Sequence, residues 1–319
     1  MEFKHLPVML NEVIDGLDIK PDGIYVDCTI GGGGHSSKIL EKLSPKGHLY
    51  GFDRDLEAVN FCKQKFLENK NITIIHSNYK EAPKILKELG IENIDGVLID
   101  LGVSSYQIDN GERGFSFLHN GRLDMRMDKE QKLDAYYVVN NYSREELIQI
   151  LYKYGEEDNA KRIVENICKA RELKPIETTF ELKDIIEQSF PKKIIYGKGG
   201  VSKKTFQAIR IEVNGELDKL DDLLEEFIQM LSPKGRMAIL TFHSLEDRIV
   251  KNVFKLASTG CICPPKTPVC ICGHKESVKL INRKPIVATE EELNQNSRSS
   301  SAKLRIVEKL WKCFFKILK

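Results

Sequence analysis

Apolar residues in the first hundred positions form short continuous runs that are separated by segments with helical spacing. Runs of this length without polar interruptions are typical of parallel strands buried on both faces. The intervening segments supply the helices that parallel strands need for their crossovers. The pattern predicts an α/β fold with a parallel, doubly wound sheet, whose first four strands are expected at 25–27, 48–53, 72–75 and 94–100.

This alternation stops near Ser105. From residue 133 to about 190, helical patterns follow one another without a strand between them, and Ser143 begins a capping-box sequence with Glu146. A second helix start of this kind is expected at 177–182. The segment therefore predicts an inserted helical domain.

The strand and helix pattern returns towards the C-terminus. We expect a helix around 206–213, an amphipathic helix at 217–231, a turn at 233–235, and strands at 235–242 and 302–309. The sequence thus predicts a discontinuous core domain, residues 1–108 and 206–319, interrupted by a helical domain at 109–205.

Composition narrows the class of protein. With 319 residues, of which 41% are hydrophobic and 30% charged, the chain has the composition of a folded globular protein. It has no apolar run long enough to cross a membrane, and its first residues lack the order of a signal peptide. We expect a cytoplasmic protein with reduced thiols and no stable membrane association.

The formal net charge is only +2, so a nucleic-acid partner would have to be bound by a local patch. Six basic residues and no acidic one lie between Pro191 and Ile211, including Lys203, Lys204 and Arg210. This segment is either a binding surface or an ordinary solvated loop.

Four consecutive glycines, residues 31–34, follow the first predicted strand, which ends at Asp27. Glycines let a backbone approach a ligand closely, and Ser36 or Ser37 would cap the helix that follows. The pattern of a dinucleotide site needs glycine where Ser36 stands, and Thr29 replaces the first glycine of the usual methyltransferase loop. By itself the segment indicates either a nucleoside-cofactor loop or a tight turn.

Acidic residues end two further strands. Asp53 ends the second strand, where a carboxylate can accept hydrogen bonds from both hydroxyls of a ribose, which favours an adenosine-containing cofactor. Asp100 ends the fourth strand and would face the same ligand crevice. The alternative for each acid is a cap on the next helix.

Several long motifs in order along the chain carry a family resemblance. The sequence resembles the bacterial 16S ribosomal RNA cytosine-N(4) methyltransferases of the MraW/RsmH type. The motifs that carry this resemblance are residues 5–10, 15–17, 27–36, 52–53, 100–107, 113–117, 123–128, 206–217 and 242–250.

The resemblance implies a Rossmann-like class I methyltransferase core with S-adenosyl-L-methionine as cofactor. It also implies that the acceptor is a cytidine of 16S ribosomal RNA, within the small ribosomal subunit. The cofactor contacts that it implies are Gly33, Gly34, His35, Asp53, Tyr79, Asp100 and Gln107. From the residues alone, the favoured interpretation is that His35 is a surface residue at a helix start and that Tyr79 is a half-buried core aromatic.

A cytosine amine is a poor nucleophile because its lone pair is delocalised into the ring, so a site must accept its hydrogens and hold it in position. Asp100 is the leading candidate for this acceptor, and Asp124 is a weaker one. Many amine methyltransferases have an Asn/Asp-Pro-Pro-aromatic segment here. Residues 100–104 lack both the prolines and the aromatic residue, which places that version of the mechanism in doubt.

Substrate contacts are expected from the insert and its ends. Basic side chains would meet phosphates, Phe115 or Phe117 would stack on a base or belong to the core, and the remaining residues would lie near the base. The candidate substrate residues are Arg113, Asp124, Arg126, Lys203, Lys204, Arg210, Asn214 and His243.

Two other interpretations retain the cofactor but assign the chain a different acceptor or a function without catalysis. The acceptor could be DNA or a protein, or the chain could be a ribosome-assembly factor that binds cofactor and RNA without transferring methyl. A homodimer is compatible with the sequence.

Four cysteines lie close together, Cys261, Cys263, Cys270 and Cys272. Zinc sites usually have two to four residues between the paired ligands, whereas here each pair is separated by one. We therefore expect a proline-stiffened loop of reduced cysteines without a metal, with zinc as the alternative.

Overall fold

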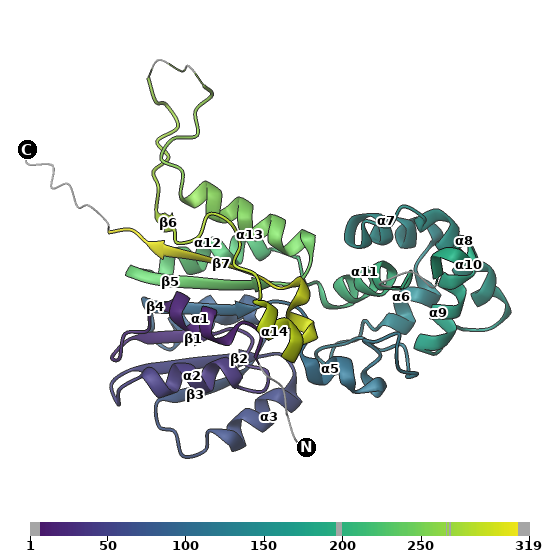
Figure 1. The fold of residues 1–319 in the computed structure, drawn as a ribbon, viewed down its shortest axis with the longest axis horizontal. Helices are drawn as coiled ribbons and strands as arrows, with labels where there is room; N and C mark the ends of the chain where they lie inside the picture. The colour runs from purple at the N-terminus through teal and green to yellow at the C-terminus, as the bar shows by residue number, and fades with distance from the viewer. Residues whose placement is uncertain (1–6, 196–199, 266, 268, 312–319) are drawn as a thin grey trace, which may run out of the picture. The chain divides into compact units, whose positions relative to one another are not determined.

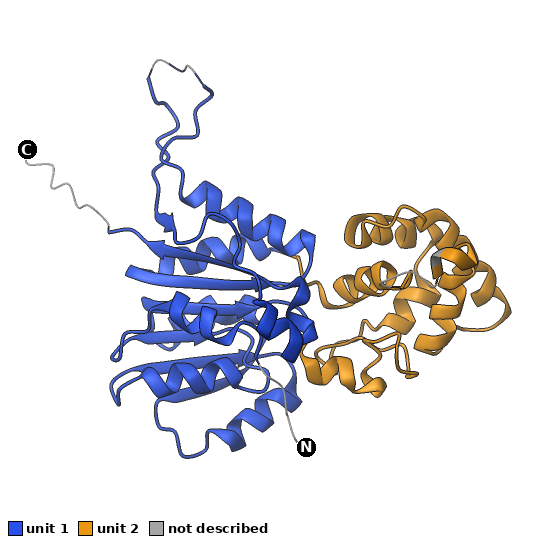
Figure 2. Cartoon of the chain, viewed as in Figure 1, with its two compact units in different colours: residues 1–102, 219–319 blue, residues 103–218 orange. Residues whose placement is uncertain are grey.

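The computed structural model describes residues 7–195, 200–265, 267 and 269–311. The chain divides into two compact units, which Figure 2 distinguishes by colour. Unit 1 combines residues 1–102 with residues 219–319, and unit 2 consists of residues 103–218. In the described part of the chain, no helix has the length and apolar character needed to cross a membrane.

Unit 1 is built on a seven-stranded sheet in the order β3-β2-β1-β4-β5-β7-β6 (Figure 1). The first five strands of this order are parallel, whereas β7 is antiparallel to both β5 and β6. The strands are β1 (Ile24–Asp27), β2 (His48–Asp53), β3 (Ile72–His76), β4 (Ile94–Asp100), β5 (Leu231–Thr241), β6 (Val278–Leu280) and β7 (Lys303–Lys309). The predicted parallel α/β sheet is confirmed.

Helices of unit 1 cover both faces of this sheet. Contacts join α1 to α2 and to the central strands, and join α12 to both α4 and α13. The helices are α1 (Leu10–Leu17), α2 (Gly34–Lys42), α3 (Leu56–Lys65), α4 (Ala82–Glu88), α12 (Leu220–Met230), α13 (Ser244–Ala257) and α14 (Glu290–Gln295), with 3-10 turns η1 (Tyr79–Glu81) and η3 (Ser297–Ser301).

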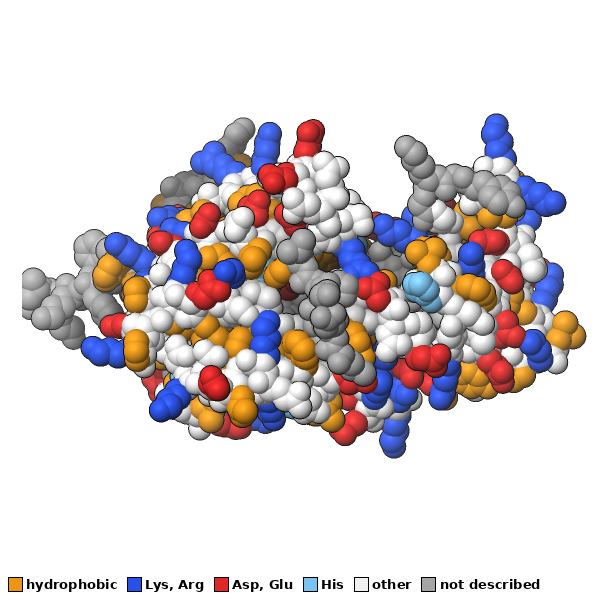
Figure 3. All heavy atoms as spheres, turned by 60° about the horizontal axis from the view of Figure 1, so that its bottom comes forward, with side chains coloured by type: hydrophobic (Ala, Val, Ile, Leu, Met, Phe, Trp, Pro, Cys, Tyr) orange, Lys and Arg blue, Asp and Glu red, His pale blue; other side chains and the backbone are white. Residues whose placement is uncertain are grey.

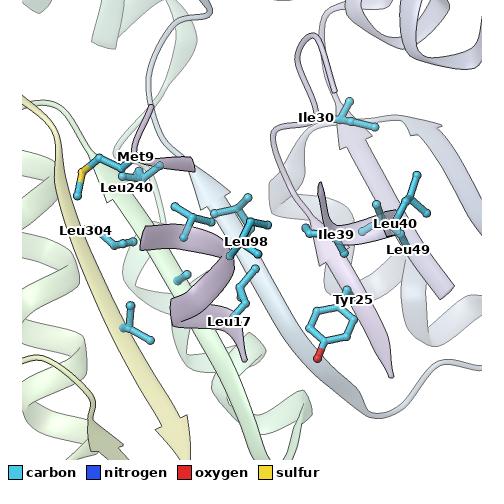
Figure 4. Close-up of a cluster of buried hydrophobic side chains, with 14 of the residues drawn as sticks. Met9, Leu17, Tyr25, Ile30, Ile39, Leu40, Leu49, Leu98, Leu240 and Leu304 are labelled. Atoms are coloured by element: carbon cyan, nitrogen blue, oxygen red, sulfur yellow. The ribbon is translucent and has the colours of Figure 1, made fainter. Parts of the chain in front are cut away.

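The apolar core under α1 and α2 fixes the position of the strand ends. Figure 4 shows Leu17 of α1 and Ile39 of α2 beside the strand residues Tyr25, Leu49 and Leu98. All five side chains are at most 2% exposed. Because side chains alternate along a strand, the neighbouring residues of each strand point to the other face and pack under α4, α12 and α13.

The turn predicted at 233–235 lies inside β5 and does not precede it. The pairing of β4 with β5 shifts register between Ile94 and Gly96, so that Ile94 pairs with Leu231 and Gly96 with Arg236. Lys234 adopts a positive φ of 62° within this irregularity. The segment is therefore a bulge that keeps both ends of β5 in the sheet.

Unit 2 is helical, as predicted, and the helix starts expected near Ser143 and Thr178 both have capping boxes. Helix α7 packs against α11 and α8, and α8 packs against α9. The elements are α5 (Ser105–Asp109), η2 (Gly111–Arg113), α6 (Ala135–Asn141), α7 (Arg144–Gly155), α8 (Ala160–Leu173), α9 (Thr179–Glu187), α10 (Lys192–Ile195) and α11 (Lys203–Asn214).

The boundaries between the units differ from the predicted ones. The sequence pattern suggested changes at 108/109 and 205/206, whereas the compact units change at 102/103 and 218/219. The larger difference concerns α11, whose apolar face we assigned to the core domain. That face is buried against α6 and α7 of unit 2. Periodicity alone identifies an apolar face but not the unit that covers it.

Candidate active site

Three carboxylates end neighbouring strands of the sheet in unit 1. Asp27 ends β1, Asp53 ends β2 and Asp100 ends β4. Since β2, β1 and β4 are adjacent and parallel, the three acids lie at one edge of the sheet. In open α/β sheets the carboxyl edge is where ligands bind.

The glycine loop between β1 and α2 has a backbone that other residues adopt poorly. Gly31 has φ +49° and Gly33 has φ +69°, and a Cβ atom on Gly33 would lie 2.7 Å from the ring of Phe66. The ammonium group of Lys65 donates to the carbonyl oxygens of Gly32 at 2.9 Å and Gly33 at 3.0 Å. Lys65 and Phe66, at the C-terminal end of α3, thus contact the loop and fix its conformation.

Neither serine caps α2 with its side chain, contrary to our prediction; the N-cap residue is Gly33. The Ser36 hydroxyl is buried and donates to Oδ2 of Asp27 at 2.6 Å. The Ser37 hydroxyl donates to the carbonyl oxygen of Gly33 at 2.6 Å. The N–H groups at the start of α2 therefore lack a side-chain acceptor from the cap residue, which suits a ligand that accepts hydrogen bonds.

His35 and Tyr79 are the next two predicted cofactor contacts. The His35 ring is buried, with Nε2 3.0 Å from the carbonyl oxygen of Val8, and burial lowers the pKa of His35 to about 4. The ring joins the N-terminal segment to α2, and its lowered pKa favours the neutral form. Tyr79 is half-buried and begins the turn that follows β3.

Asp100 has a carboxylate that the described residues leave partly unsatisfied. Its backbone N–H donates to Oγ1 of Thr29 at 2.7 Å. Its Oδ1 is buried and has no hydrogen-bond partner among the described residues. Burial, together with the negative charges of Asp27 and Glu246, raises the pKa of Asp100 to about 8. A buried acceptor without a partner is costly, so it marks a position where a donor or a cation would be stabilised.

The other two acids show the same electrostatic pattern. Burial raises the pKa of Asp27 and that of Asp53 to about 6, despite the hydrogen bonds that each carboxylate accepts. Three buried carboxylates with raised pKa values at one sheet edge favour a positively charged ligand.

Gln107 lies in unit 2 and is largely buried. Its Oε1 accepts from the backbone N–H of Ser104 at 3.0 Å, and its own N–H donates to the Ser104 hydroxyl at 3.2 Å. This capping box fixes the first turn of α5.

The arginines Arg113 and Arg126 are used within unit 2. The Arg113 guanidinium is 2% exposed and donates to the carbonyl oxygens of Arg126 and Met127, both at 3.0 Å. Arg126 forms a bidentate pair with Asp124, both bonds 2.8 Å long. Burial alone would raise the pKa of Asp124, but the bonds from Arg126 hold it below its usual value.

Arg210 and Asn214 on α11 are likewise internal. Arg210 forms a bidentate pair with Glu216 at 2.8 and 2.9 Å. Asn214 is 6% exposed, accepts from the N–H of Met127 at 2.9 Å and donates to the carbonyl oxygen of Met125 at 2.8 Å. In this structure the guanidinium groups of Arg113, Arg126 and Arg210, which we predicted to face RNA phosphates, are all bonded to partners inside the unit.

Other predicted substrate residues have different surroundings. Lys203 and Lys204 are exposed at the start of α11, although the Lys204 amine donates to the carbonyl oxygen of Glu156. His243 precedes α13 in unit 1, and its Nε2 lies 3.1 Å from Oε1 of the buried Glu246. Of the remaining basic run, Lys192 and Lys193 are exposed, whereas 196–199 fall outside the described residues.

The two candidate stacking residues divide between core and surface. Phe115 is buried, and Phe117 is half-buried with its ring 5.4 Å from that of Phe206. Neither lies on a strand. Core packing therefore explains Phe115, and partly explains Phe117.

Sequence reasoning missed a cavity of about 420 Å³ in unit 2. Arg122, Tyr136, Glu177 and Thr178 line it, and Arg122 is exposed and paired with Asp134 at 3.1 Å. These residues come from three separate segments, so no local motif could have indicated the cavity.

The sheet order with an antiparallel β7, the glycine loop after β1 and the acid at the end of β2 define a class I, Rossmann-like methyltransferase that uses S-adenosylmethionine. The model of the MraW methylase family matches residues 2–310, and the chain belongs to this family. Both the family and the cofactor agree with the expectation from the sequence motifs.

Curated relatives match along nearly their whole length. The chain is 53% identical over 312 residues to "Ribosomal RNA small subunit methyltransferase H" of Finegoldia magna, covering 97% of this chain and 100% of that protein. The protein of the same name from Lachnospira eligens is 51% identical over 311 residues, covering 97% of this chain and 99% of that protein. One from Clostridium botulinum is 50% identical over 310 residues, covering 97% and 100%.

Proposed function

We propose that this chain methylates N4 of a cytidine in 16S ribosomal RNA, within the small ribosomal subunit in the cytoplasm. The names of the relatives support a small-subunit ribosomal RNA as the substrate. The observation that carries the chemistry is the enclosed Oδ1 of Asp100, which has no partner among the described residues at the carboxyl edge of the sheet.

Residues at this edge fit S-adenosylmethionine. Asp53 would accept from the ribose hydroxyls. The N–H groups of Gly34 and His35 would meet the cofactor at the start of α2, and Gly33, whose own N–H donates to the Ile30 carbonyl oxygen, would contact it through the loop backbone. The acidic edge complements a sulfonium cation. When bound, the cofactor supplies an electrophilic methyl group.

Two further contacts belong to this proposal. Tyr79 would lie near the adenine, since it begins the turn after β3, next to the strand that carries Asp53. Gln107 would meet the methionine end. Its Oε1 accepts from the Ser104 N–H and so caps α5.

Asp100 would act on the acceptor amine. The sulfonium cation of the bound cofactor would lower the raised pKa of Asp100 and favour its ionised form, whose Oδ1 can accept a hydrogen of the amine. Asp100 would hold the nitrogen in position and take up the proton released when that nitrogen is methylated. Asp124 is a poor candidate for this role because both of its oxygens bind Arg126.

RNA contacts in unit 2 would come from lysines more than from arginines. Lys192, Lys193, Lys203 and Lys204 are exposed. Acidic and basic side chains are interspersed on the face drawn in Figure 3, as expected for a net charge of +2. Binding would therefore depend on this local group of lysines.

The test uses the purified full chain, methyl-labelled S-adenosylmethionine and small ribosomal subunits that lack the modification. We expect labelled N(4)-methylcytidine after digestion of the RNA. Label in another nucleoside, in DNA or in protein would replace the proposed acceptor. Cofactor binding without any transfer would favour an assembly factor.

Asp100→Asn tests the catalytic role in the same assay at saturating cofactor, with Asp222→Asn on the exposed face of α12 as the matched control. We expect a loss of at least about a hundredfold in turnover for Asp100→Asn, the usual size of a general-base contribution. Normal turnover of this variant would exclude Asp100 as the acceptor.

A further inference from the structure

Four cysteines lie close together in a long loop of unit 1, residues 258–277, which we call the excursion. The proposed methyl transfer does not use this loop. The excursion leaves the sheet after α13 and returns at β6, and Figure 1 shows it as a long loop beyond the end of α13. One ligand atom from each of Cys261, Cys263, Cys270 and Cys272 lies within 4.8 Å of the others. All four are free thiols and come from the two arms of the same loop.

The sulfur positions have the dimensions of a tetrahedral metal centre. The Cys261 Sγ lies 3.5 Å from that of Cys270 and 3.8 Å from that of Cys272. The Cys270 Sγ lies 3.6 Å from that of Cys272 and 4.0 Å from that of Cys263. A zinc–sulfur bond of about 2.3 Å places the corners of a regular tetrahedron about 3.8 Å apart. Disulfide sulfurs would lie about 2.05 Å apart, so the four thiols match a metal site and not two disulfides.

We propose that Cys261, Cys263, Cys270 and Cys272 bind one zinc ion as a closed, structural site. Four thiolate ligands select a soft divalent ion and leave no position for a substrate or a catalytic water. This site lies outside the methyltransferase chemistry. It replaces our expectation of a metal-free loop of reduced cysteines.

The spacing of one residue within each pair does not prevent this geometry. Alternate residues of an extended segment project to the same side, so a Cys-x-Cys pair can present both sulfurs to one centre. The Cys270 and Cys272 sulfurs lie 3.6 Å apart on this arrangement. The backbone N–H of Ile271, between them, donates to Cys263 Sγ on the opposite arm at 3.4 Å. Such N–H to sulfur bonds orient and stabilise metal-bound thiolates.

The composition of the excursion explains what a metal would contribute. Its apolar residues point outward, since Ile262, Val269 and Ile271 are 50%, 73% and 83% exposed. Hydrogen bonds at the base, including the one from the Ser277 N–H to the Ala257 carbonyl oxygen at 2.8 Å, fix only the ends. No described residue of this segment has a buried side chain, so the segment needs another source of order, and a metal cross-link between its arms supplies it.

The test measures metal in the full chain, expressed with zinc and purified under reducing conditions. We expect about one zinc per chain by elemental analysis, and four thiols that become reactive towards a thiol reagent only after a strong chelator is added. Replacement of zinc by Co²⁺ should give the visible absorption bands of a tetrahedral cobalt thiolate.

The double variant Cys270→Ser with Cys272→Ser removes two ligands, and Cys168→Ser is the control because Cys168 lies on α8, in unit 2. We expect zinc to fall to background in the double variant and to stay at one per chain in the control. A far-UV spectrum checks that both variants are folded. Absence of zinc from the folded native chain, zinc that survives the double substitution, or a mass showing disulfides among these cysteines would each overturn the proposal.

Discussion

Asp53 Oδ2 accepts a hydrogen bond from the backbone N–H of Gly31 at 2.9 Å, so the acid that ends β2 also fixes the loop that follows β1. Its other oxygen accepts from the N–H of Asp55 at 2.9 Å, at the start of α3. One carboxylate thus joins three elements of the cofactor edge. The proposed ribose contact and the shape of the glycine loop are therefore coupled through Asp53.

Asp53→Asn should weaken binding of S-adenosylmethionine by at least about tenfold. The amide lacks the charge of the carboxylate and offers one acceptor oxygen in place of two, and a charge-assisted hydrogen bond contributes about 1.5 to 3 kcal/mol. Titration calorimetry measures the affinity directly. Exposed Glu68→Gln on the same unit provides the control, and an unchanged affinity for Asp53→Asn would remove this residue from the cofactor site.

Gly33→Ala should lower both stability and cofactor affinity. Its φ of +69° strains a side chain, and the new Cβ would lie 2.7 Å from the Phe66 ring. Gly90→Ala is the matched control, because Gly90 has φ +80° but no atom within 4 Å of a new Cβ. Backbone strain of about 1 kcal/mol is common to both variants. We expect a larger fall in Tm for Gly33→Ala, and loss of cofactor binding for that variant alone; equal behaviour of the two would argue against a tight loop.

Asp100 should make the free energy of unfolding of the ligand-free protein decrease as the pH rises. Its pKa is raised to about 8 in the folded chain, whereas an unfolded aspartate titrates at about 4. Between these values the folded chain holds the extra proton, so this residue reduces the free energy of unfolding as the pH rises. Asp100→Asn should therefore become more stable relative to the native chain from about pH 5 to about pH 8, by on the order of 1 to 3 kcal/mol.

Thermal unfolding of both proteins at several pH values measures this difference. His35 has the opposite sign, since its lowered pKa of about 4 adds stability as the pH rises through its usual range. It is present in both proteins, so its contribution cancels in the comparison. A stability difference that does not change with pH would contradict the raised pKa of Asp100.

The sequence predicted the sheet of unit 1 well because its signals are local. Continuous apolar runs ended at Asp53 and Asp100, and these are the observed ends of β2 and β4. The bulge around Lys234 was not predicted, since a Pro and a Gly indicate a turn but not whether the strand continues beyond it. The unit to which α11 belongs was also missed, because that depends on which distant helices cover its apolar face.

The candidate site was predictable in its residue types but not in its pairings. A single sequence shows that Arg113 is basic, yet not that its guanidinium binds the backbone of residues 126 and 127. Likewise, the Cys-x-Cys spacing argued against a metal, and only the folded loop brings the two pairs together. Side-chain partners distant in sequence decide these roles, and local pattern does not contain them.

Replacement of the internal arginines of unit 2 should lower its stability, whereas replacement of the exposed lysines should weaken RNA binding. Arg113→Ala leaves the carbonyl oxygens of residues 126 and 127 without their buried donor, which costs about 2 kcal/mol or more and should lower Tm by several degrees. The combined replacement of Lys192, Lys193 and Lys203 by alanine should leave Tm nearly unchanged, because these side chains are exposed.

The same lysine variant should bind 16S ribosomal RNA more weakly and with a shallower dependence on salt. Each phosphate contact that is lost lowers the slope of log affinity against log salt by about 0.7 to 0.9. Filter binding over a range of salt concentrations gives this slope, and cofactor affinity serves as the internal control because the lysines belong to unit 2 and Asp53 to unit 1. If Arg113→Ala kept its Tm but lost RNA binding, while the lysine variant bound normally, the RNA contact would have to be reassigned to the arginines.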